Sequence, residues 1–309
     1  LEVVNGKAFK VVKGERPQID YRKVPTNSYE PYVLQLKFKP NKTNEPPFME
    51  MKSTGKGFVE TGIKAVDKIN QEIRAIQYKP LLLPLYQIVS KSLENKDRHK
   101  AWGFHLWYQV TVDTKTDLIS AIEKYQALDE IEIVQPVFKK RPIGFVAPDI
   151  TKNRALEGDK TDVSKWAAND PRYNEQWHYH NTGQQSGTID KDIDLPEAWE
   201  IEKGSSDVIV AIIDEGVQYN HPDLATNMWP GLGPEGTSTT IGDHGTHVGG
   251  TVAAVSNNST GVAGIAGGDG AGGVKLMTID LFENGLGMTT LAMFTYAADN
   301  GAVISQNSW

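Results

Sequence analysis

Two residues, an aspartate and a histidine, stand where α/β proteins commonly place reactive groups. Asp214 ends a continuous apolar run over residues 208–213, and Glu215 and Gly216 follow it. Such a run is typical of a strand buried on both faces, and open parallel sheets bind ligands beyond the carboxyl ends of their strands. Asp214 therefore occupies the position of a catalytic acid, although strands also end in aspartate to hold a metal or a ribose, or to cap a helix.

The histidine lies in a glycine-rich segment, residues 242–254. The segment predicts a helix that packs closely against its neighbour through the small residues Gly249, Gly250, Ala253 and Ala254. His244 lies at the beginning of this helix. A histidine there is held rigidly while its ring faces a cleft. Two alternatives remain: close packing alone, or a metal held by His244 and His247. The spacing supplies no third ligand in register, which disfavours zinc.

Several motifs in order resemble the subtilases, the subtilisin- and kexin-like serine proteases. The motifs are Asp214-Glu-Gly216, His221-Pro-Asp-Leu224, His244-Gly-Thr-His-Val-Gly-Gly250, Asn169-Asp-Pro171, Gln176-Trp-His178, Asn181-Thr-Gly-Gln184, residues 257–262 and Ser308-Trp309. The resemblance covers residues 167–309, and the combination is far more specific than any single motif.

This resemblance implies a catalytic triad of which the sequence holds two members. His244 would act as general base and acid, and Asp214 would orient its ring while a serine attacks the peptide carbonyl. Family order places that serine after the histidine, so Ser238 is rejected, and Asn307 does not match the oxyanion-hole asparagine. We expect the serine on a second chain or a continuation, and residues 1–309 alone to be inactive.

The resemblance also implies a structural calcium ion. Its ligands would be the side chains of Asp170, Asp223 and Asn258 and the backbone carbonyls of Ser256, Thr260 and Val262. Such hard oxygen ligands suit calcium. Alternatively, Asp223 serves a turn or a cap and Asn258 serves a tight turn.

Substrate contacts follow from the same resemblance. The edge strand at Gly285, Leu286 and Gly287 would pair with an extended peptide, with Ser308 and Trp309 on the other side. Glu215 matches an acid that kexin-like members direct at a basic substrate residue. The alternatives are an ordinary turn at the two glycines and an exposed acid without a role. Gln306 and Asn307 add one residue to the usual motif, which leaves the register of the cleft open.

The elements that must position these residues form a parallel α/β sheet. Strand-like and helical runs alternate at residues 208–213, 247–255, 274–279, 291–298 and 302–305. This alternation predicts an N-terminal half of a subtilisin-like domain over residues 167–309.

The front of the chain has a different pattern. Strands are predicted at residues 32–38, 102–112 and 131–138, and amphipathic helices at 63–76 and 117–128, the second capped near Thr116. This order suits a small α+β ferredoxin-like domain over residues 29–141, preceded by a polar lead-in at 1–28. Residues 142–166 read as a linker.

Charge divides the chain in the same way. The whole sequence carries −7, with +7 on residues 1–141 and −14 on the remainder. Two modules of opposite charge attract, although solvated faces also differ by chance. The front lysines are scattered, which excludes a nucleic-acid patch, and no apolar run has the length of a membrane span. With no cysteine, the chain has no disulfide or thiolate metal site.

The front domain resembles a subtilase propeptide, which acts as folding chaperone and inhibitor. Residues 131–138 match its closing strand, and Lys139-Lys-Arg141 is a candidate processing site or a solvated basic linker. The resemblance implies a secreted or cell-envelope zymogen with a peptide substrate. The competing class is a catalytically inactive pseudoprotease or propeptide-led inhibitor that serves binding.

Overall fold

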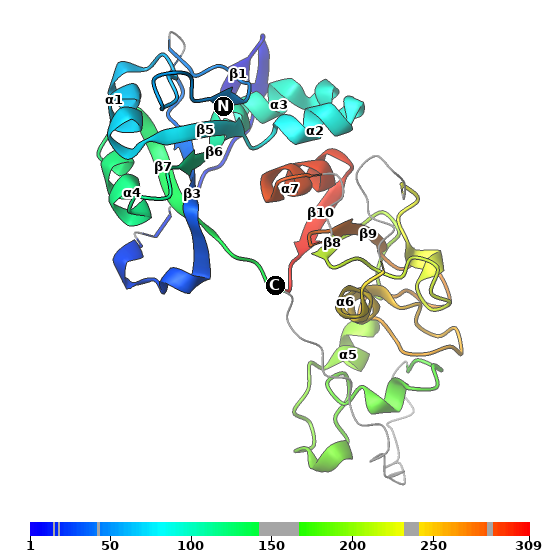
Figure 1. The fold of residues 1–309 in the computed structure, drawn as a ribbon. Coiled ribbons are helices and arrows are strands. Elements are labelled where there is room, and N and C mark those ends of the chain that lie inside the picture. Colours follow the sequence, from blue (N-terminus) through cyan, green and yellow to red (C-terminus); the bar gives the residue numbers. More distant parts are fainter. Residues whose placement is uncertain (15, 18, 42–43, 142–166, 232–240, 283–286) are drawn as a thin grey trace. The chain divides into compact units, whose positions relative to one another are not determined.

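The computed structural model describes residues 1–309 except 15, 18, 42–43, 142–166, 232–240 and 283–286. The chain divides into two compact units (Figure 1). Unit 1 comprises Leu1–Lys140 and Gly287–Ala292, and unit 2 comprises Arg141–Leu286 and Met293–Trp309. Among the described residues, no helix is both long and apolar enough to span a bilayer.

Unit 1 contains a five-stranded antiparallel sheet. Its spatial order is β4-β5-β6-β3-β7, where the strands are β3 (Tyr29–Phe38), β4 (Met51–Lys52), β5 (Ala75–Pro80), β6 (Trp107–Val112) and β7 (Ile131–Phe138). The central strand β3 pairs with β6 on one side and β7 on the other, so its apolar residues Leu34 and Leu36 are fully buried. Alternating apolar positions therefore place one face of the sheet in the core.

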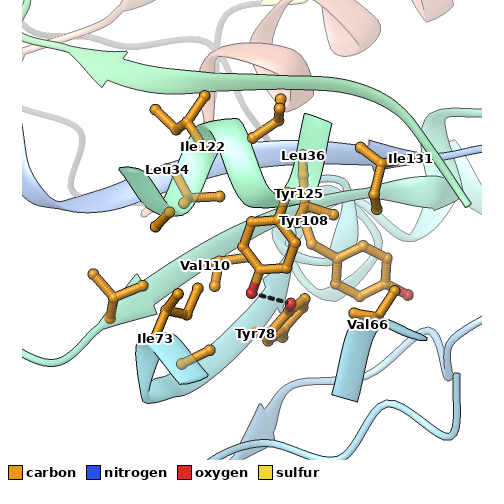
Figure 2. Close-up of a cluster of buried hydrophobic side chains, with 14 of the residues drawn as sticks. Leu34, Leu36, Val66, Ile73, Tyr78, Tyr108, Val110, Ile122, Tyr125 and Ile131 are labelled. Atoms are coloured by element: carbon orange, nitrogen blue, oxygen red, sulfur yellow. Dashed lines mark hydrogen bonds between the residues drawn. The ribbon is translucent and has the colours of Figure 1, made fainter. Parts of the chain in front are cut away.

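Two helices supply the other half of this core, α1 (Lys64–Ile73) and α4 (Leu118–Gln126). A polar network lies inside it: the hydroxyls of Tyr78 and Tyr125 contact each other at 2.8 Å, and both donate to Asn70 Oδ1 at 2.7 and 2.6 Å. Figure 2 shows the contact between the two tyrosines among the surrounding apolar side chains. Asn70 in turn donates to the carbonyl of Val59, so each of these buried polar side chains is satisfied.

Smaller elements surround the sheet. A segment between β5 and β6 holds α2 (Leu83–Ile88) and α3 (Lys96–Ala101), and the hairpin β1 (Glu2–Val4) and β2 (Lys7–Phe9) packs on α3. Asn5 and Lys7 both contact Asp97, at 2.7 and 3.1 Å. Short 3₁₀ turns lie at Tyr21–Lys23, Thr26–Ser28, Ser90–Asn95 and Phe104–Leu106.

Unit 2 contains a three-stranded parallel sheet of order β10-β8-β9, which confirms the predicted parallel α/β arrangement. The strands are β8 (Ile209–Asp214), β9 (Lys275–Asp280) and β10 (Ala302–Gln306), and the helices are α5 (Leu195–Trp199), α6 (Asp243–Ala253) and α7 (Thr290–Asp299). Central β8 is buried from Val210 to Asp214. Further 3₁₀ turns lie at Tyr173–Glu175, Gln184–Ser186 and Ala225–Asn227.

Several boundaries in unit 1 differ from the prediction. The strand predicted over 102–112 begins only at Trp107, because Trp102 caps α3 and Phe104–Leu106 form a 3₁₀ turn. The helix predicted over 63–76 ends at Ile73, because Arg74 adopts a left-handed conformation with φ 51° and its N–H bonds to Asn70 O. Ile76 then belongs to β5 rather than to the helical stripe. The cap of α4 is Asp117, which accepts from the Ile119 N–H at 3.1 Å, and not Thr116.

Candidate active site

The two residues singled out for catalysis form a hydrogen-bonded pair. His244 Nδ1 lies 2.8 Å from Asp214 Oδ1, and their side chains are 13% and 2% exposed. Asp214 ends strand β8, and His244 is the second residue of helix α6. A carboxylate at this distance keeps the imidazole proton on Nδ1, which leaves Nε2 as the atom able to accept a proton from a substrate or nucleophile.

Asp214 is held by its own backbone surroundings as well. Its Oδ1 also accepts a hydrogen bond from the Glu215 N–H at 2.8 Å. Its Oδ2 is buried and has no hydrogen-bond partner within the described part of the chain. The buried carboxylate thus binds the imidazole through one oxygen and has spare acceptor capacity on the other.

Glycine makes the approach of the two elements possible. A Cβ on Gly245 would lie 2.2 Å from the Gly216 carbonyl oxygen and 3.3 Å from Asp214 Cβ. One turn further, a Cβ on Gly249 would lie 3.3 Å from Val217. Gly216 itself has a positive φ of 96°, which lets the chain turn directly after Asp214. The glycines thus bring α6 against the end of β8.

Glu215, predicted as a substrate contact, bonds instead to the helix that carries the histidine. Its Oε1 accepts from the His244 backbone N–H at 2.6 Å. Its Cγ fills the space beside Gly242, where a Cβ would lie 2.3 Å away. This contact gives Glu215 a structural role, and its role toward substrate stays a prediction.

Of the other predicted substrate residues, the structure describes only some. Gly285 and Leu286 lie outside the described residues, and Gly287, with φ 63°, groups with unit 1, so their role stays a prediction. The Ser308 hydroxyl accepts from Gln306 Nε2 at 2.8 Å. The Trp309 indole N–H donates to the Ile213 carbonyl at 2.9 Å, one residue before Asp214.

The predicted calcium ligands lie together in one loop region. Asp170 accepts from the N–H groups of Asn257 and Asn258 at 2.7 and 3.3 Å, and Asp223 accepts from the Val262 N–H and Asn258 Nδ2, both at 2.9 Å. Both carboxylates are buried. Burial and, to a lesser extent, the charge of Asp170 raise the pKa of Asp223, while its hydrogen bonds lower it in part.

Two predicted ligands already have protein partners. Asn258 Oδ1 accepts from the Thr260 N–H at 2.7 Å, and the Ser256 carbonyl accepts from Gly270 N at 2.7 Å. The loop is nevertheless built around the acid: Gly261 has φ 56°, and a Cβ there would lie 2.3 Å from Asp223 Oδ2. The site therefore fits a divalent cation in its two buried carboxylates, and Asn258 would have to turn over to join them.

The alternative zinc site gains no support. The described residues contain no group of three or more histidine, cysteine or acidic side chains placed to hold a metal ion. Burial lowers the pKa of His247, and the neighbouring His244 lowers it further. Burial likewise lowers the pKa of His178, with a smaller contribution from His247.

Sequence reasoning missed Asp280. This residue ends β9 directly opposite Asp214 in the parallel register, is buried, and accepts from the Phe282 N–H at 2.9 Å. The signal was present, because the run at 274–279 ends in an acid just as the run at 208–213 does. The missed contact of Trp309 with Ile213 has no local signal, since 96 residues separate the partners.

Comparison with known proteins matches the region that holds the pair to one family. Residues 205–309 match the model of the subtilase family, a peptidase family. The predicted resemblance is confirmed. The match contains Asp214, His244 and Trp309, so the subtilase region includes the whole site around the pair.

Individual relatives agree. Bovine neuroendocrine convertase 2 is 35% identical over 120 residues, which are 35% of this chain and 19% of that protein. Thermitase from Thermoactinomyces vulgaris is 41% identical over 115 residues, 36% of this chain and 40% of thermitase. Rat furin is 28% identical over 213 residues, 64% of this chain and 24% of furin. The chain thus spans well under half the length of these relatives.

Among solved structures, the Aeromonas sobria serine protease in complex with its chaperone is similar. It is 27% identical, the match covers 44% of this chain and 24% of that one, and the TM-score is 0.36.

Proposed function

We propose that this chain supplies the aspartate and the histidine of a serine endopeptidase that cleaves peptide bonds with an Asp-His-Ser triad. The observation that carries the proposal is the 2.8 Å contact between His244 Nδ1 and Asp214 Oδ1, within the region that matches the subtilases. The serine and the oxyanion asparagine would come from sequence outside residues 1–309, and these residues alone would be inactive.

The proposed mechanism assigns each residue one task. His244 Nε2 removes the proton from the serine hydroxyl as this attacks the peptide carbonyl, and later delivers it to the leaving amine. Asp214 keeps the Nδ1 tautomer and stabilises the imidazolium. Ser308 and Trp309, which follow β10, would flank one side of an extended peptide, and residues 285–287 the other.

Residues 29–141 would be the propeptide of a zymogen. The strand order β7-β3-β6-β5 with helices α1 and α4 supports a ferredoxin-like arrangement. The charge of +7 on residues 1–141, against −14 on the remainder, supports its role as an inhibitor and folding partner of the peptidase region. Processing would occur at Lys139-Lys-Arg141, directly after β7, in a secreted or cell-envelope enzyme.

A preference for basic residues would follow from the same charge. The acidic peptidase region favours cationic peptides, and Glu215 lies next to Asp214 as the proposed contact for a basic side chain.

Labelling with a fluorophosphonate probe tests the proposal on the full-length protein. We expect labelling of one serine in the wild type and none in His244→Ala, because the serine then lacks its base. The matched control is His247→Ala, three residues further along the same helix, which should label normally. Labelling that is absent from the wild type would contradict the proposal and favour a pseudoprotease or inhibitor.

Calcium would be held by Asp170 and Asp223, with Asn258 and the carbonyls of Thr260 and Val262 completing the shell. It would supply charge neutralisation in a loop that otherwise buries two like charges. No step of the reaction passes through it.

Calcium binding predicts a difference in thermal stability. The pKa of Asp223 is raised in the folded protein above its ordinary value of 3.8. The folded protein therefore loses stability as the pH rises from 3.8 through the folded pKa, and at neutral pH the charged Asp223 is destabilising. We expect calcium to raise the Tm of the wild type but not of Asp223→Asn. In chelator, Asp223→Asn should be at least as stable as the wild type.

Asp207→Asn serves as the control, because it removes one exposed acid from unit 2 away from this loop. An equal calcium response in Asp223→Asn and the wild type, measured by differential scanning calorimetry, would place the ion elsewhere.

A further inference from the structure

The contacts around His244 form a closed ring of three residues. Asp214 Oδ1 binds the imidazole Nδ1 at 2.8 Å, and the same oxygen accepts from the Glu215 N–H at 2.8 Å. Glu215 Oε1 then accepts from the His244 backbone N–H at 2.6 Å. Two consecutive residues therefore hold the histidine at both ends, one by the ring and one by the backbone.

Helix α6 needs an external cap because it cannot provide its own. The residue at its N-cap, Gly242, has no side chain, and no side-chain cap is formed there. The first N–H groups of a helix have no partner within it, and a carboxylate is the acceptor that the helix dipole favours. Glu215 provides this acceptor from the loop after β8, and Gly242 leaves the space that its Cγ occupies.

The rest of the loop is attached to the same helix turn. The Gln218 N–H donates to Thr246 Oγ1 at 2.8 Å, and Thr246 Oγ1 donates to the Gly242 carbonyl at 2.6 Å. Residues 215–218 thus follow the first turn of α6 closely. Removing the Glu215 carboxylate would leave the backbone N–H of His244 without this acceptor, and His244 is the residue of that turn that carries the reactive ring.

We propose that Glu215 is a positioning residue for the reaction: its carboxylate caps α6 at His244 and so fixes the imidazole against Asp214. This proposal rests on the proposed protease function for its kinetic readout only. It also assigns Glu215 a task that is independent of any basic residue in the substrate. The helix dipole favours the charge of a carboxylate, but the hydrogen bond itself requires only an acceptor oxygen at the end of a side chain of this length.

Four variants separate length from charge. Glu215→Gln keeps the oxygen and the length but removes the charge, Glu215→Asp keeps the charge but is one methylene shorter, and Glu215→Ala removes both. Asp243→Asn is the matched control, since it removes an exposed charge from the first residue of the same helix and is not part of the ring of contacts.

The spectroscopic readout uses the full-length protein labelled with ¹⁵N-histidine. We expect a slowly exchanging His244 amide and a low-field Nδ1 proton in the wild type, Glu215→Gln and Asp243→Asn. In Glu215→Ala and Glu215→Asp, both signals should exchange much faster. A His244 amide that exchanges equally in all five proteins would overturn the proposal.

The kinetic readout uses two fluorogenic peptides that differ only by Arg or Leu before the scissile bond. We expect Glu215→Ala and Glu215→Asp to lower kcat roughly ten- to a hundredfold on both peptides with KM nearly unchanged, and Glu215→Gln to restore kcat. If Glu215→Gln instead matches Glu215→Ala, with a raised KM for the Arg peptide alone, Glu215 is a substrate contact and the proposal fails.

The two proposals fail in different ways. A wild type that neither hydrolyses the peptides nor reacts with the fluorophosphonate contradicts the protease function. The exchange of the His244 amide then still decides whether Glu215 caps the helix.

Discussion

The two units of this protein achieve close packing by opposite means. In unit 1, large side chains fill the space between a sheet and two helices, and Tyr78, Tyr108 and Tyr125 are all fully buried. In unit 2, backbones approach each other directly: a Cβ on Gly245, Gly264 or Gly267 would lie 1.9–2.4 Å from a backbone atom of another segment. Unit 1 is thus sensitive to the removal of atoms, and unit 2 to their addition.

The difference follows from what each region must position. A core of interlocking side chains fixes a shape, and small changes in volume are felt throughout it. The contact between Asp214 and His244 needs two backbones that approach each other closely, and Gly245 permits this approach. We therefore expect substitutions of opposite kinds to damage the two units, in the following order of size.

The largest effect should come from one added methyl group in unit 2. Gly245→Ala forces a Cβ against the Gly216 carbonyl, so α6 must move away from β8 and the Asp214–His244 contact should break. We expect a loss of about 3 kcal/mol in the free energy of unfolding. The control is Gly250→Ala in the same helix, where the new Cβ meets no atom within 4 Å and should be stabilising. Urea unfolding measures both, and equal losses would contradict the comparison.

A slightly smaller effect is expected from atom removal in unit 1. Asn70→Ala leaves the Val59 carbonyl and the hydroxyls of Tyr78 and Tyr125 without their shared partner, at a cost of about 2–3 kcal/mol. Tyr78→Phe should cost only about 1 kcal/mol, because Tyr125 keeps its bond to Asn70. Urea unfolding followed by far-UV circular dichroism distinguishes them. If Tyr78→Phe is as damaging as Asn70→Ala, the network does not depend on the asparagine.

The ion pair between the buried Lys37 and the partly exposed Glu132 in unit 1 sharpens the comparison by its pH dependence. Lys37, whose side chain is 5% exposed, lies 3.0 Å from Glu132, and burial lowers the pKa of Lys37 despite this partner. Glu132→Gln should cost about 2 kcal/mol at neutral pH. Because the pKa of Lys37 is lowered on folding, the folded protein binds fewer protons at this site than the unfolded chain does. The loss in the free energy of unfolding caused by Glu132→Gln should therefore shrink as the pH rises toward 10.5, the ordinary pKa of lysine.

The matched control for this pair is Glu72→Gln. Glu72 lies 2.7 Å from Lys124, but both side chains are about 40% exposed. An exposed pair contributes less than about 1 kcal/mol, and the loss should be screened by salt. Urea midpoints between pH 6 and pH 10 test both variants, and a deficit for Glu132→Gln that does not change over this range would refute the explanation.

The smallest effect should come from Trp309. Trp309→Phe keeps the aromatic ring but loses the hydrogen bond to the Ile213 carbonyl, at a cost of about 1 kcal/mol. Trp177→Phe is the control, since Trp177 is 43% exposed. The low-field proton of His244 should broaden in the first variant only, because Ile213 directly precedes Asp214. An unchanged proton signal would show that Trp309 does not help to hold the end of β8.

Local patterns predicted what local forces determine. The strand at 131–138 was predicted to the residue, since alternating apolar residues and flanking polar residues define it. Asp214 and His244 were predicted because an apolar run ends in one and a glycine-rich helix begins at the other. The helix predicted over 63–76 was too long, because the apolar spacing continues to Ile76 although Arg74 ends the helix by its backbone conformation.

Contacts between distant residues were not predictable in the same way. The cap from Glu215 to His244 joins residues 29 apart, and nothing in either local pattern indicates it. Glu215 was predicted to meet substrate because it matches an acid that kexin-like members direct at a basic substrate residue, and the sequence does not show that Gly242 and Glu215 lie side by side. The assignment depends on the space that a glycine leaves, which only the folded chain shows.

The position of β8 in its sheet also determines how long the edges of this strand stay unpaired during synthesis. Both of its partners follow it in the chain, β9 at Lys275–Asp280 and β10 at Ala302–Gln306. At roughly 5–20 residues per second, β8 leaves the ribosome some 5–20 seconds before its last partner does. The sheet of unit 1 ends at Phe138 and can form within that time, since mixed α/β domains fold in milliseconds to seconds. A newborn chain therefore carries the finished β4-β5-β6-β3-β7 sheet while the strand that bears Asp214 still has an open edge, and that interval is when a chaperone or an aggregating neighbour would meet it.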